Sequence, residues 1–408
     1  MRFQVRFQLS LMMFMEYFIW GVWYVTAGTY LTEIGFEGTD VGKAYSSLAW
    51  GAIISSFFIS LVADRYFAAE KLTGVLHLLA GCIMFLVSKI TNPGLFFWVV
   101  LLYMILYMPT IALTNAIAFH QTKEAGKDFP GIRVLGTIGW IVAGIMISLL
   151  NIEKGPEPMR YAALFSILLG IFCFFLPHTP PKSTGKKVNI KDILGLDALK
   201  LMKNRSFTVL IICSLLITLP FAMYHQFTNM SLNELGIENA AGKMTLGQMS
   251  EVIFMLVMPF FFVRLGVKKM VLIGMFAWVA RYLLFSFGDD PALVSFFYIG
   301  ILLHGICFDF FYVTCQIYVD HKAPVSVRAG VQGFYTLITY GVGWLLGTLL
   351  SGVILEKYQI MDDAGKVINH TWPAVMRIPA IIAAVVAVIF LIFFKDEKDK
   401  IKLEEKLL

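Results

Sequence analysis

Charged residues are scarce in this chain. They make up 15% of its 408 residues, while hydrophobic residues make up 58%. A typical soluble domain is roughly one quarter charged and slightly under half apolar. The apolar residues occur in repeated runs of about 20, and a run of that length can cross the hydrocarbon core of a bilayer as a helix. The composition therefore excludes an ordinary soluble globular protein and indicates a membrane protein with many spans.

The apolar runs also lack the alternation of apolar and polar residues that a transmembrane β-barrel requires. Only helices and closed barrels satisfy their backbone polar groups in lipid, so we expect an all-α polytopic membrane protein. No small-residue cleavage site follows the first apolar run, and we interpret that run as the first span rather than as a signal peptide.

Several chemical signatures are missing as well. The sequence has no Walker loop, dinucleotide fingerprint or nucleophile elbow, which disfavours ATP-driven transport and enzymatic activity. Its five cysteines lie in apolar runs without metal-ligand spacing, as is typical of core packing. We therefore predict no cofactor and no metal. The net charge of +6 lies in loops, where it indicates topology rather than nucleic-acid binding.

The apolar runs predict twelve spans in two groups of six. Between the groups lies one long polar connection, whose second part has the period of an amphipathic helix at the membrane surface. We predict a first six-helix bundle (1–177), a cytoplasmic linker with that helix (178–205), a second bundle (206–394) and a charged cytoplasmic tail (395–408). The predicted spans are 7–31, 43–63, 70–89, 93–119, 131–151, 158–177, 206–230, 245–265, 268–287, 291–318, 326–354 and 371–394.

Lysine and arginine residues predict the orientation, because cytoplasmic loops carry an excess of them. With the N-terminus in the cytoplasm, the cytoplasmic segments contain most of these residues, including those of the linker and the tail. An even number of spans then returns the C-terminus to the same side. We therefore expect both termini in the cytoplasm.

One apolar run carries polar residues where lipid or protein interior is expected. It spans 301–320 and contains His304 and Asp309, with Phe308 beside the acid. An ionised carboxylate at the centre of a bilayer costs from about 2.5 to well over 10 kcal/mol. Such an acid is tolerated only where it faces a cavity or a partner. We therefore predict that Asp309 is the chemical centre of the protein.

A second acid lies on the eighth predicted span. Gln248 and Glu251 are three residues apart and share one helix face. A carboxyl group in a low-dielectric cavity resists ionisation, so it can load and release a proton near neutral pH. With Asp309, these residues suggest a proton relay that also accepts hydrogen bonds from substrate hydroxyl groups. A structural ion pair with Arg281 is the alternative.

Amide side chains share one face of the seventh span. Gln226 and Asn229 have the spacing that suits recognition of a polar ring or of sugar hydroxyl groups, although such amides also join helices to one another. His225 lies one residue off that face. It can be a hydrogen-bonding group or a proton carrier.

The first half contributes a second set of candidates. Arg133, Thr137 and Trp140 form a row on the fifth span, and stacking with hydrogen bonding is what a heteroaromatic ligand needs. Glu16 lies among aromatic residues of the first span, which suggests the wall of a binding cavity, although such aromatic residues also pack or face lipid. The inner end of the second span carries an acid and a base side by side, Asp64 and Arg65. Such a pair suits a charge clamp in a cytoplasmic gate.

Specific motifs resemble the nucleoside:H+ symporter family of the major facilitator superfamily. The loop at 61–71 is similar to a shortened form of the superfamily signature. The family motifs follow in order over nearly the whole chain: YSSL (45–48), YMPT (107–110), DFPGIRVLGTIGW (128–140), LGLDALKLMKN (194–204), QMSEVIFMLVMPFFFVRLGVK (248–268), FDFF (308–311) and RAGVQGF (328–334).

The resemblance implies two bundles that rock about a substrate at the membrane midplane. It implies proton coupling and nucleoside binding at Asp309 and Glu251. Substrate contacts are implied for Arg133, Thr137 and Gln248, and Phe308 would stack or pack nearby.

The chain also departs from the family pattern. A relative's glutamine and asparagine on the seventh span align with Ala222 and His225. Glu16 stands where that relative has glutamine, and Trp140 replaces a phenylalanine. These changes leave the choice between nucleosides, modified nucleosides and other glycosides open.

The sequence thus predicts a monomeric proton-coupled symporter that imports nucleosides across the bacterial cytoplasmic (inner) membrane, with lipid as its surroundings. A facilitator or symporter for another sugar-containing molecule is the alternative on the same fold. A membrane enzyme or sensor is disfavoured because no soluble domain and no catalytic constellation are present.

Overall fold

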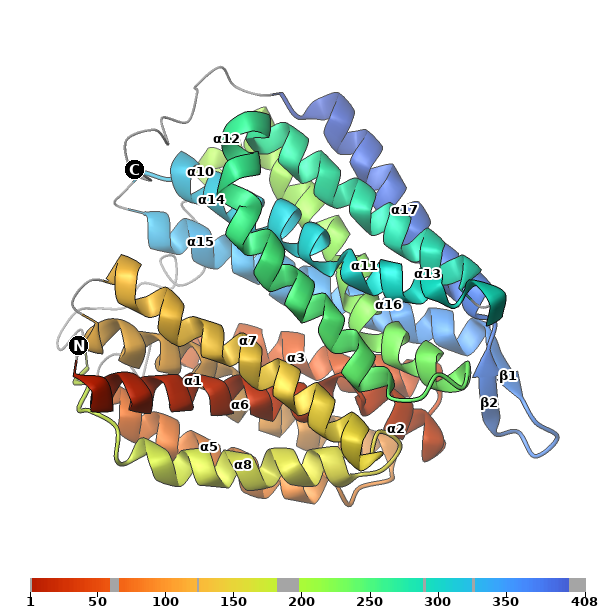
Figure 1. Cartoon of the computed structure of the whole chain (residues 1–408), viewed down its shortest axis with the longest axis horizontal. Helices are drawn as coiled ribbons and strands as arrows, with labels where there is room; N and C mark the ends of the chain where they lie inside the picture. Colours follow the sequence, from red (N-terminus) through yellow and green to blue (C-terminus); the bar gives the residue numbers. More distant parts are fainter. Residues whose placement is uncertain are drawn as a thin grey trace. The chain divides into compact units, whose positions relative to one another are not determined.

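The computed structural model describes residues 2–58, 66–122, 125–181, 198–288, 291–324 and 327–395. Within these ranges the chain is helical apart from its connections and one β-hairpin (Figure 1). Three predicted features lie outside the described residues: the gate pair Asp64 and Arg65, most of the linker, and nearly all of the tail.

The N-terminal part of the chain is a series of helices with short connections. Asn92 illustrates how one of them starts: its side chain accepts a hydrogen bond from the Leu95 N–H at 3.0 Å, and Pro93 occupies the first turn. The helices are α1 (Phe3–Tyr24), α2 (Ala27–Glu33), α3 (Gly38–Phe58), α5 (Ala69–Val87), α6 (Pro93–Gln121), α7 (Ala125–Leu150) and α8 (Glu157–Cys173).

The C-terminal part is less regular. Two of its membrane-spanning stretches contain π-helical segments, η3 (Ile306–Val313) and η4 (Leu337–Gly343), and such segments are frequent at functional sites. The other elements are α10 (Ala198–Leu201), α11 (Arg205–Glu234), α12 (Ala240–Phe287), η2 (Pro291–Leu293), α13 (Ser295–Leu302), α14 (Thr314–Lys322), α15 (Arg328–Thr336), α16 (Trp344–Lys357), β1 (Gln359–Met361), β2 (Val367–His370) and α17 (Trp372–Phe393). Strands β1 and β2 pair antiparallel.

Among the described residues, nine helical stretches are long and apolar enough to cross a membrane. One of them, α12, has 48 residues and breaks at Gly266, whose φ of 68° is readily adopted only by glycine. It therefore covers two predicted spans, and α3 and α8 cover two others. A helix thus corresponds to each of the twelve predicted spans, and the predicted all-α polytopic fold is confirmed.

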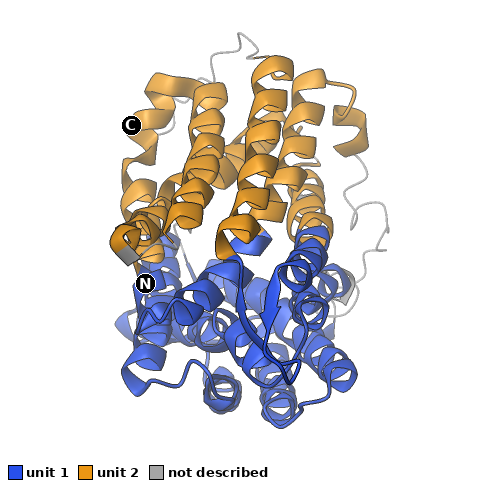
Figure 2. Ribbon diagram, turned by 90° about the vertical axis from the view of Figure 1, so that its right-hand side faces the viewer, with its two compact units in different colours: residues 1–189, 222–245, 344–371 blue, residues 190–221, 246–343, 372–408 orange. Residues whose placement is uncertain are grey.

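The chain forms two compact units (Figure 2). Unit 1 comprises residues 1–189, 222–245 and 344–371, and unit 2 comprises residues 190–221, 246–343 and 372–408. The division passes through α11 and α12. Unit 1 therefore includes one end of α11, the start of α12 and all of α16, beside the N-terminal helices.

Within unit 1, α3 and α16 approach each other closely at glycines. A Cβ atom added to Gly42 would lie 2.7 Å from the Thr348 carbonyl oxygen and 2.9 Å from the Gly352 Cα. Both atoms belong to the backbone and cannot move aside as a flexible side chain would. Glycine at this position therefore permits the helix contact, as small residues commonly do between membrane helices.

We predict that Gly42→Ala weakens the α3–α16 contact. Overpacking a close contact typically costs about 1–3 kcal/mol, so the apparent Tm of the purified protein in detergent should fall. Gly94→Ala is the matched control: it brings the same gain in helix propensity, but its Cβ would approach only the Asn92 side chain, at 3.5 Å. Equal Tm values for the two variants would contradict the proposed packing.

Candidate functional site

Asp309 lies in η3 of unit 2 and is completely buried. Neither of its carboxylate oxygens has a hydrogen-bond partner in the part of the chain that the structure describes. A buried ionised carboxylate without such partners is costly, and a proton removes the cost by neutralising it. Asp309 therefore lies where an ionised carboxylate is unfavourable, and its role as a proton-carrying group stays a prediction.

The second predicted acid, Glu251 of α12, lies beside a histidine. Its Oε2 is 3.6 Å from His304 Nε2, and the Glu251 side chain is 20% exposed whereas that of His304 is 4% exposed. The His304 ring stacks on Phe308, with centroids 6.2 Å apart. Sequence reasoning noted His304 as a polar residue in an apolar run but gave it no role. Only folding brings it to Glu251, which is distant in sequence.

Aromatic rings extend this region of unit 2. Phe221 of α11 has ring centroids 5.9 Å from Phe308 and 5.0 Å from Tyr312. The Tyr312 hydroxyl in turn donates to Thr218 Oγ1 at 3.1 Å. Phe308 is only partly buried, so part of its ring surface stays accessible within this group of aromatic residues. The sequence did not single out Phe221, because one phenylalanine among 36 carries no distinguishing signal.

Arg281, the alternative partner for the acids, is buried in α12. Its Nε donates to the Gly300 carbonyl oxygen at 2.9 Å, and its guanidinium lies 4.8 Å from the centre of the Trp278 ring. These contacts join α12 to α13.

In unit 1, α7 presents the predicted row of Arg133, Thr137 and Trp140, all partly buried. The Arg133 guanidinium lies 4.0 Å from the centre of the Tyr17 ring of α1, a cation–π contact. Trp140 meets Trp20 of α1 edge to face at 5.3 Å. The row therefore combines hydrogen-bond donors with a supported aromatic surface.

The predicted residues of α11 also lie in unit 1, against other helices. The His225 ring is 5.3 Å from Trp344 and 6.5 Å from Trp140. Gln226 Oε1 accepts a hydrogen bond from Ser351 of α16. Asn229 Oδ1 accepts one from Thr29 of α2 at 2.6 Å. In this conformation both amides thus have interhelical partners.

Glu153, in the α7–α8 connection, was not predicted as a site residue. Its Oε2 accepts from the side-chain amides of Asn229 at 3.0 Å and Asn233 at 2.9 Å. Its Oε1 accepts from the Ser148 hydroxyl at 3.0 Å and from the Ala241 N–H at 2.9 Å. This one buried carboxylate therefore fastens the α7–α8 connection to both α11 and α12.

Glu16 of α1 is completely buried. Its carboxylate contacts His77 of α5 at 2.9 Å and accepts a hydrogen bond from Thr110 of α6 at 2.7 Å. These contacts place the Glu16 side chain inside the helix packing of unit 1.

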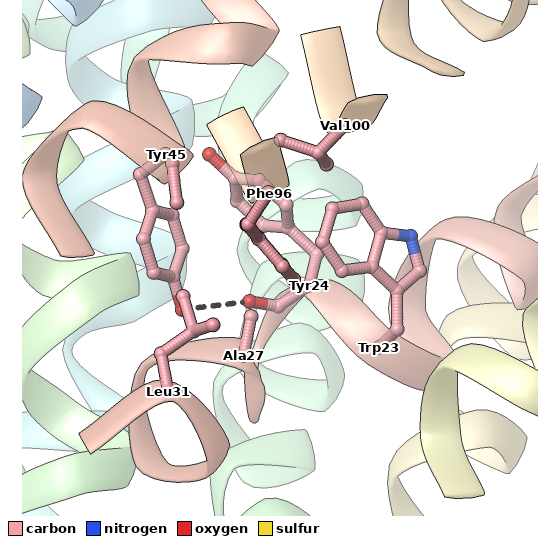
Figure 3. A pocket seen from close by; sticks show the side chains of 8 residues that line it. Trp23, Tyr24, Ala27, Leu31, Tyr45, Phe96 and Val100 are labelled. Atoms are coloured by element: carbon pink, nitrogen blue, oxygen red, sulfur yellow. Dashed lines mark hydrogen bonds between the residues drawn. The ribbon is translucent and has the colours of Figure 1, made fainter. Parts of the chain in front are cut away.

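A small apolar pocket in unit 1 is lined by Trp23, Tyr24, Ala27, Leu31, Ala44, Tyr45, Phe96 and Val100 (Figure 3). The Tyr45 hydroxyl donates to the Tyr24 carbonyl oxygen at 2.9 Å and accepts from the Gly28 N–H at 2.9 Å. It thereby fastens the break between α1 and α2 to α3. None of the predicted site residues lines this pocket, so we assign it to packing.

This predominantly helical architecture, with a buried acid in a long apolar helical stretch, is that of a polytopic membrane protein. The crystal structure of the nucleoside transporter NupG matches it with a TM-score of 0.86 at 30% identity, covering 96% of this chain and 100% of that one.

Sequence comparison identifies the family. The chain matches the model of the nucleoside H+ symporter family over residues 3–399. It is 43% identical to the putative nucleoside transporter YegT of Escherichia coli, covering 97% of this chain and 95% of the relative. It is 32% identical to the xanthosine permease of the same organism, covering 98% and 99%. The chain therefore belongs to the nucleoside H+ symporter family, and its relatives are transporters rather than enzymes.

We predict that Glu153→Gln destabilises unit 1. The substitution replaces one carboxylate oxygen of Glu153 by an NH2 group. That group cannot accept the two hydrogen bonds that the oxygen accepted. Hydrogen bonds to a charged group contribute about 1.5–3 kcal/mol each, so the loss should be about 2–4 kcal/mol and lower the apparent Tm in detergent.

Glu238→Gln is the matched control for this variant. Glu238 and Glu153 line one polar surface cavity, but Glu238, unlike Glu153, is exposed. If Glu238→Gln lowered the Tm as much as Glu153→Gln, the bonds of Glu153 would not be the cause.

Proposed function

We propose that this protein is a symporter that imports nucleosides together with protons. Family membership provides the class of substrate and of driving ion. The observation that carries the proposal is Asp309, a fully buried acid whose carboxylate oxygens have no hydrogen-bond partner among the described residues. Such an acid is unfavourable when ionised in a membrane protein interior, so the charge state of Asp309 can decide which conformations are accessible.

Proton binding at Asp309 is the coupling step in this proposal. A proton from outside neutralises the carboxyl group and removes the cost of enclosing it. The loaded carrier can then reorient and release both proton and nucleoside inside. Glu251 assists Asp309 in this step. Its 3.6 Å contact with His304 provides, in the same unit, a pair of groups that can exchange a proton. Coupling requires only that proton and substrate together stabilise the state that switches.

Both units contribute substrate contacts in this proposal. Arg133, Thr137 and Gln248 bind ribose hydroxyls and base edges, and all three are partly buried rather than sealed in the core. Trp140 and Phe308 supply aromatic surface for the base.

His225, Gln226 and Asn229 form a further group of proposed substrate contacts. In this conformation Gln226 and Asn229 bond to other helices. Their amides become available to a nucleoside only if those contacts open, so their role belongs to another stage of the cycle.

Alternating access requires contacts that break once per cycle. The hydrogen bonds of Glu153 to α11 and α12 and the glycine contact between α3 and α16 join N-terminal helices to ends of C-terminal ones. Hydrogen bonds and close contacts at glycine can break and form again, as a gate that closes once per cycle requires. We propose that these contacts hold the outer gate closed.

The proposed location is the bacterial cytoplasmic membrane, with both termini in the cytoplasm and with a single chain as the working unit. The distribution of lysine and arginine supports this orientation. In this orientation the α7–α8 connection with Glu153 lies outside, in agreement with its proposed role in the outer gate.

We predict that Asp309→Asn abolishes accumulation of nucleoside against its gradient. The amide keeps the volume and the neutral state of the acid but cannot exchange a proton. Exchange of nucleoside at equal concentrations should therefore continue. The measurement is uptake of labelled uridine and adenosine into proteoliposomes with an imposed pH gradient, with and without a protonophore.

Asp363→Asn, in the exposed β1–β2 turn, is the control for that assay. Full protonophore-sensitive accumulation by Asp309→Asn would remove Asp309 from the mechanism. Wild-type uptake that a protonophore leaves unchanged would instead indicate a facilitator.

We predict that Arg133→Lys raises the KM for nucleosides roughly two- to fivefold, because lysine keeps the charge but loses the planar set of donors, and losing one substrate hydrogen bond costs about 0.5–1 kcal/mol. The measurement is uptake kinetics, with ribose and free bases as competitors. Arg160→Lys, a change at an exposed residue paired with Glu157, should leave the KM unchanged. An unchanged KM in Arg133→Lys would argue against a substrate contact there.

A further inference from the structure

A polar cavity of unit 1 has no role in the mechanism proposed above. It lies where the α7–α8 connection meets the α11–α12 connection, and its volume is about 610 Å³. Small-molecule sites in proteins usually measure about 300–1,000 Å³, so the cavity can hold a molecule of the size of a nucleoside. Its lining includes Asn151, Lys154, Glu238 and Asn239, and all four are exposed. In the proposed orientation the cavity opens to the outside of the cell.

Two asparagines of this cavity have an unusual backbone conformation. Asn151 has a φ of 53° and Asn239 a φ of 57°, and among the described residues they are the two other than glycine with a positive φ. Gly236 of the same cavity has a φ of 73°. Glycine adopts this conformation without the steric cost that a side chain brings. Both asparagine positions thus keep an amide side chain where glycine would form the turn more easily.

The side chains around this cavity are available to a ligand. Those of Asn151 and Asn239 have no hydrogen-bond partner within the described part of the chain. Lys154 and Glu238 form no ion pair with any residue of that part. Leu149 also lines the cavity and is 80% exposed, so it adds an apolar surface. The cavity therefore offers amide, carboxylate, ammonium and apolar groups that the protein itself leaves unused.

These groups match the chemistry of a nucleoside. A carboxamide has a donor and an acceptor side by side, as the edge of a nucleobase does. The Glu238 carboxylate can accept hydrogen bonds from ribose hydroxyl groups, and Leu149 can contact the flat face of the base. Glu153 also lines the cavity, so its charged groups are two acids and one base, Lys154. The excess of acid disfavours a phosphorylated ligand and suits an uncharged one.

We propose that this cavity is a docking site where nucleosides bind before they are transported. None of the proposed substrate contacts, which together we call the transport site, lines the cavity. In the docking site, Asn151 and Asn239 bind base edges and Glu238 binds ribose hydroxyls. The proposal rests on the proposed function, because family membership identifies nucleosides as the molecules that the protein meets.

Asn233 connects the cavity to the proposed outer gate. It lines the cavity, and its side-chain nitrogen donates to Glu153 Oε2 at 2.9 Å and to the Asn229 carbonyl oxygen at 3.0 Å. A ribose hydroxyl that bonds to Glu153 or Asn233 competes with the bond between them. A docked nucleoside therefore weakens one of the contacts that hold the α7–α8 connection to α11, and docking favours opening.

The test is protection of a cysteine placed in the cavity. Lys154→Cys is made in a protein with Cys82→Ala, because Cys82 is the exposed cysteine and the other four are buried. A maleimide is added to the purified protein in detergent, and the labelling rate is measured at increasing concentrations of uridine or adenosine. Both nucleosides should slow the labelling in a saturable way. Asp363→Cys, in the exposed β1–β2 turn, is the matched control and should be labelled at a constant rate.

Two further variants remove the amides but keep the backbone. Asn151→Gly and Asn239→Gly are each added to the Lys154→Cys protein. Glycine adopts a positive φ freely, so the labelling rate without nucleoside should not change. The nucleoside concentration that halves the rate should rise about two- to tenfold for each lost amide, as expected for one hydrogen bond. Ribose and free uracil make only part of these contacts and should each protect about tenfold less well than uridine.

Direct occupancy of the cavity must be distinguished from a conformational change caused by the transport site. Arg133→Ala and Gln248→Ala each remove a proposed contact of the transport site, and either one serves if the other fails to fold. Protection of Lys154→Cys should persist in these variants at the same nucleoside concentrations. Protection that these variants lose would come from the transport site and would overturn the docking site.

Three further results would each be decisive. Labelling that neither nucleoside slows, or that is slowed equally in the Asn151→Gly and Asn239→Gly variants, would overturn the docking site and leave the proposed function standing. Ribose that protects as well as uridine would overturn the assignment to nucleosides. Protection by nucleosides, together with uptake that a protonophore leaves unchanged, would overturn the proposed symport and leave the docking site standing.

Discussion

A carboxylate inside a membrane protein must be neutralised, and this constraint organises the protein. The described structure shows three solutions. Asp309 has no hydrogen-bond partner among the described residues, and in the proposed mechanism a proton from outside neutralises it. Glu16 contacts His77 at 2.9 Å and accepts a hydrogen bond from Thr110. Glu153 accepts hydrogen bonds from side-chain amides, a hydroxyl and a backbone N–H. The first carboxylate is left without partners, the second is bonded inside the helix packing of unit 1, and the third depends on α11 and α12 staying beside the α7–α8 connection.

Irregular backbone accompanies the first of these acids. Asp309 lies within a π-helical segment, and a second such segment, η4, precedes α16. A wider turn shifts the side chains that follow it and leaves some backbone groups less tightly paired. Gly266 breaks α12 in the same unit. Unit 2 thus departs from regular helix in the stretch that contains Asp309 and at two further points, Gly266 and η4.

In the proposed mechanism, one residue of unit 1 acts at two stages of the cycle. Asn229 bonds to Thr29 and Glu153 in this conformation, so a nucleoside would have to compete with both. A substrate that replaced these bonds would also loosen the closure. Binding and opening would then be linked by shared hydrogen bonds, which is the form of coupling that alternating access needs.

The sequence by itself was enough to predict the helical membrane class and the family, and to single out the unusual acid Asp309. These depend on runs of about 20 residues or on contiguous motifs, which are local properties that lipid selects directly. Only tertiary structure decided which polar groups meet. Glu16 and His77 are 61 residues apart, and Glu153 and Asn229 are 76 apart. Their contacts depend on how each helix is rotated and packed against its neighbours. Hydropathy and spacing within a single helix leave that rotation undetermined. From the sequence, Glu16 was therefore only an acid among aromatic residues. Glu153 was only a residue of a loop.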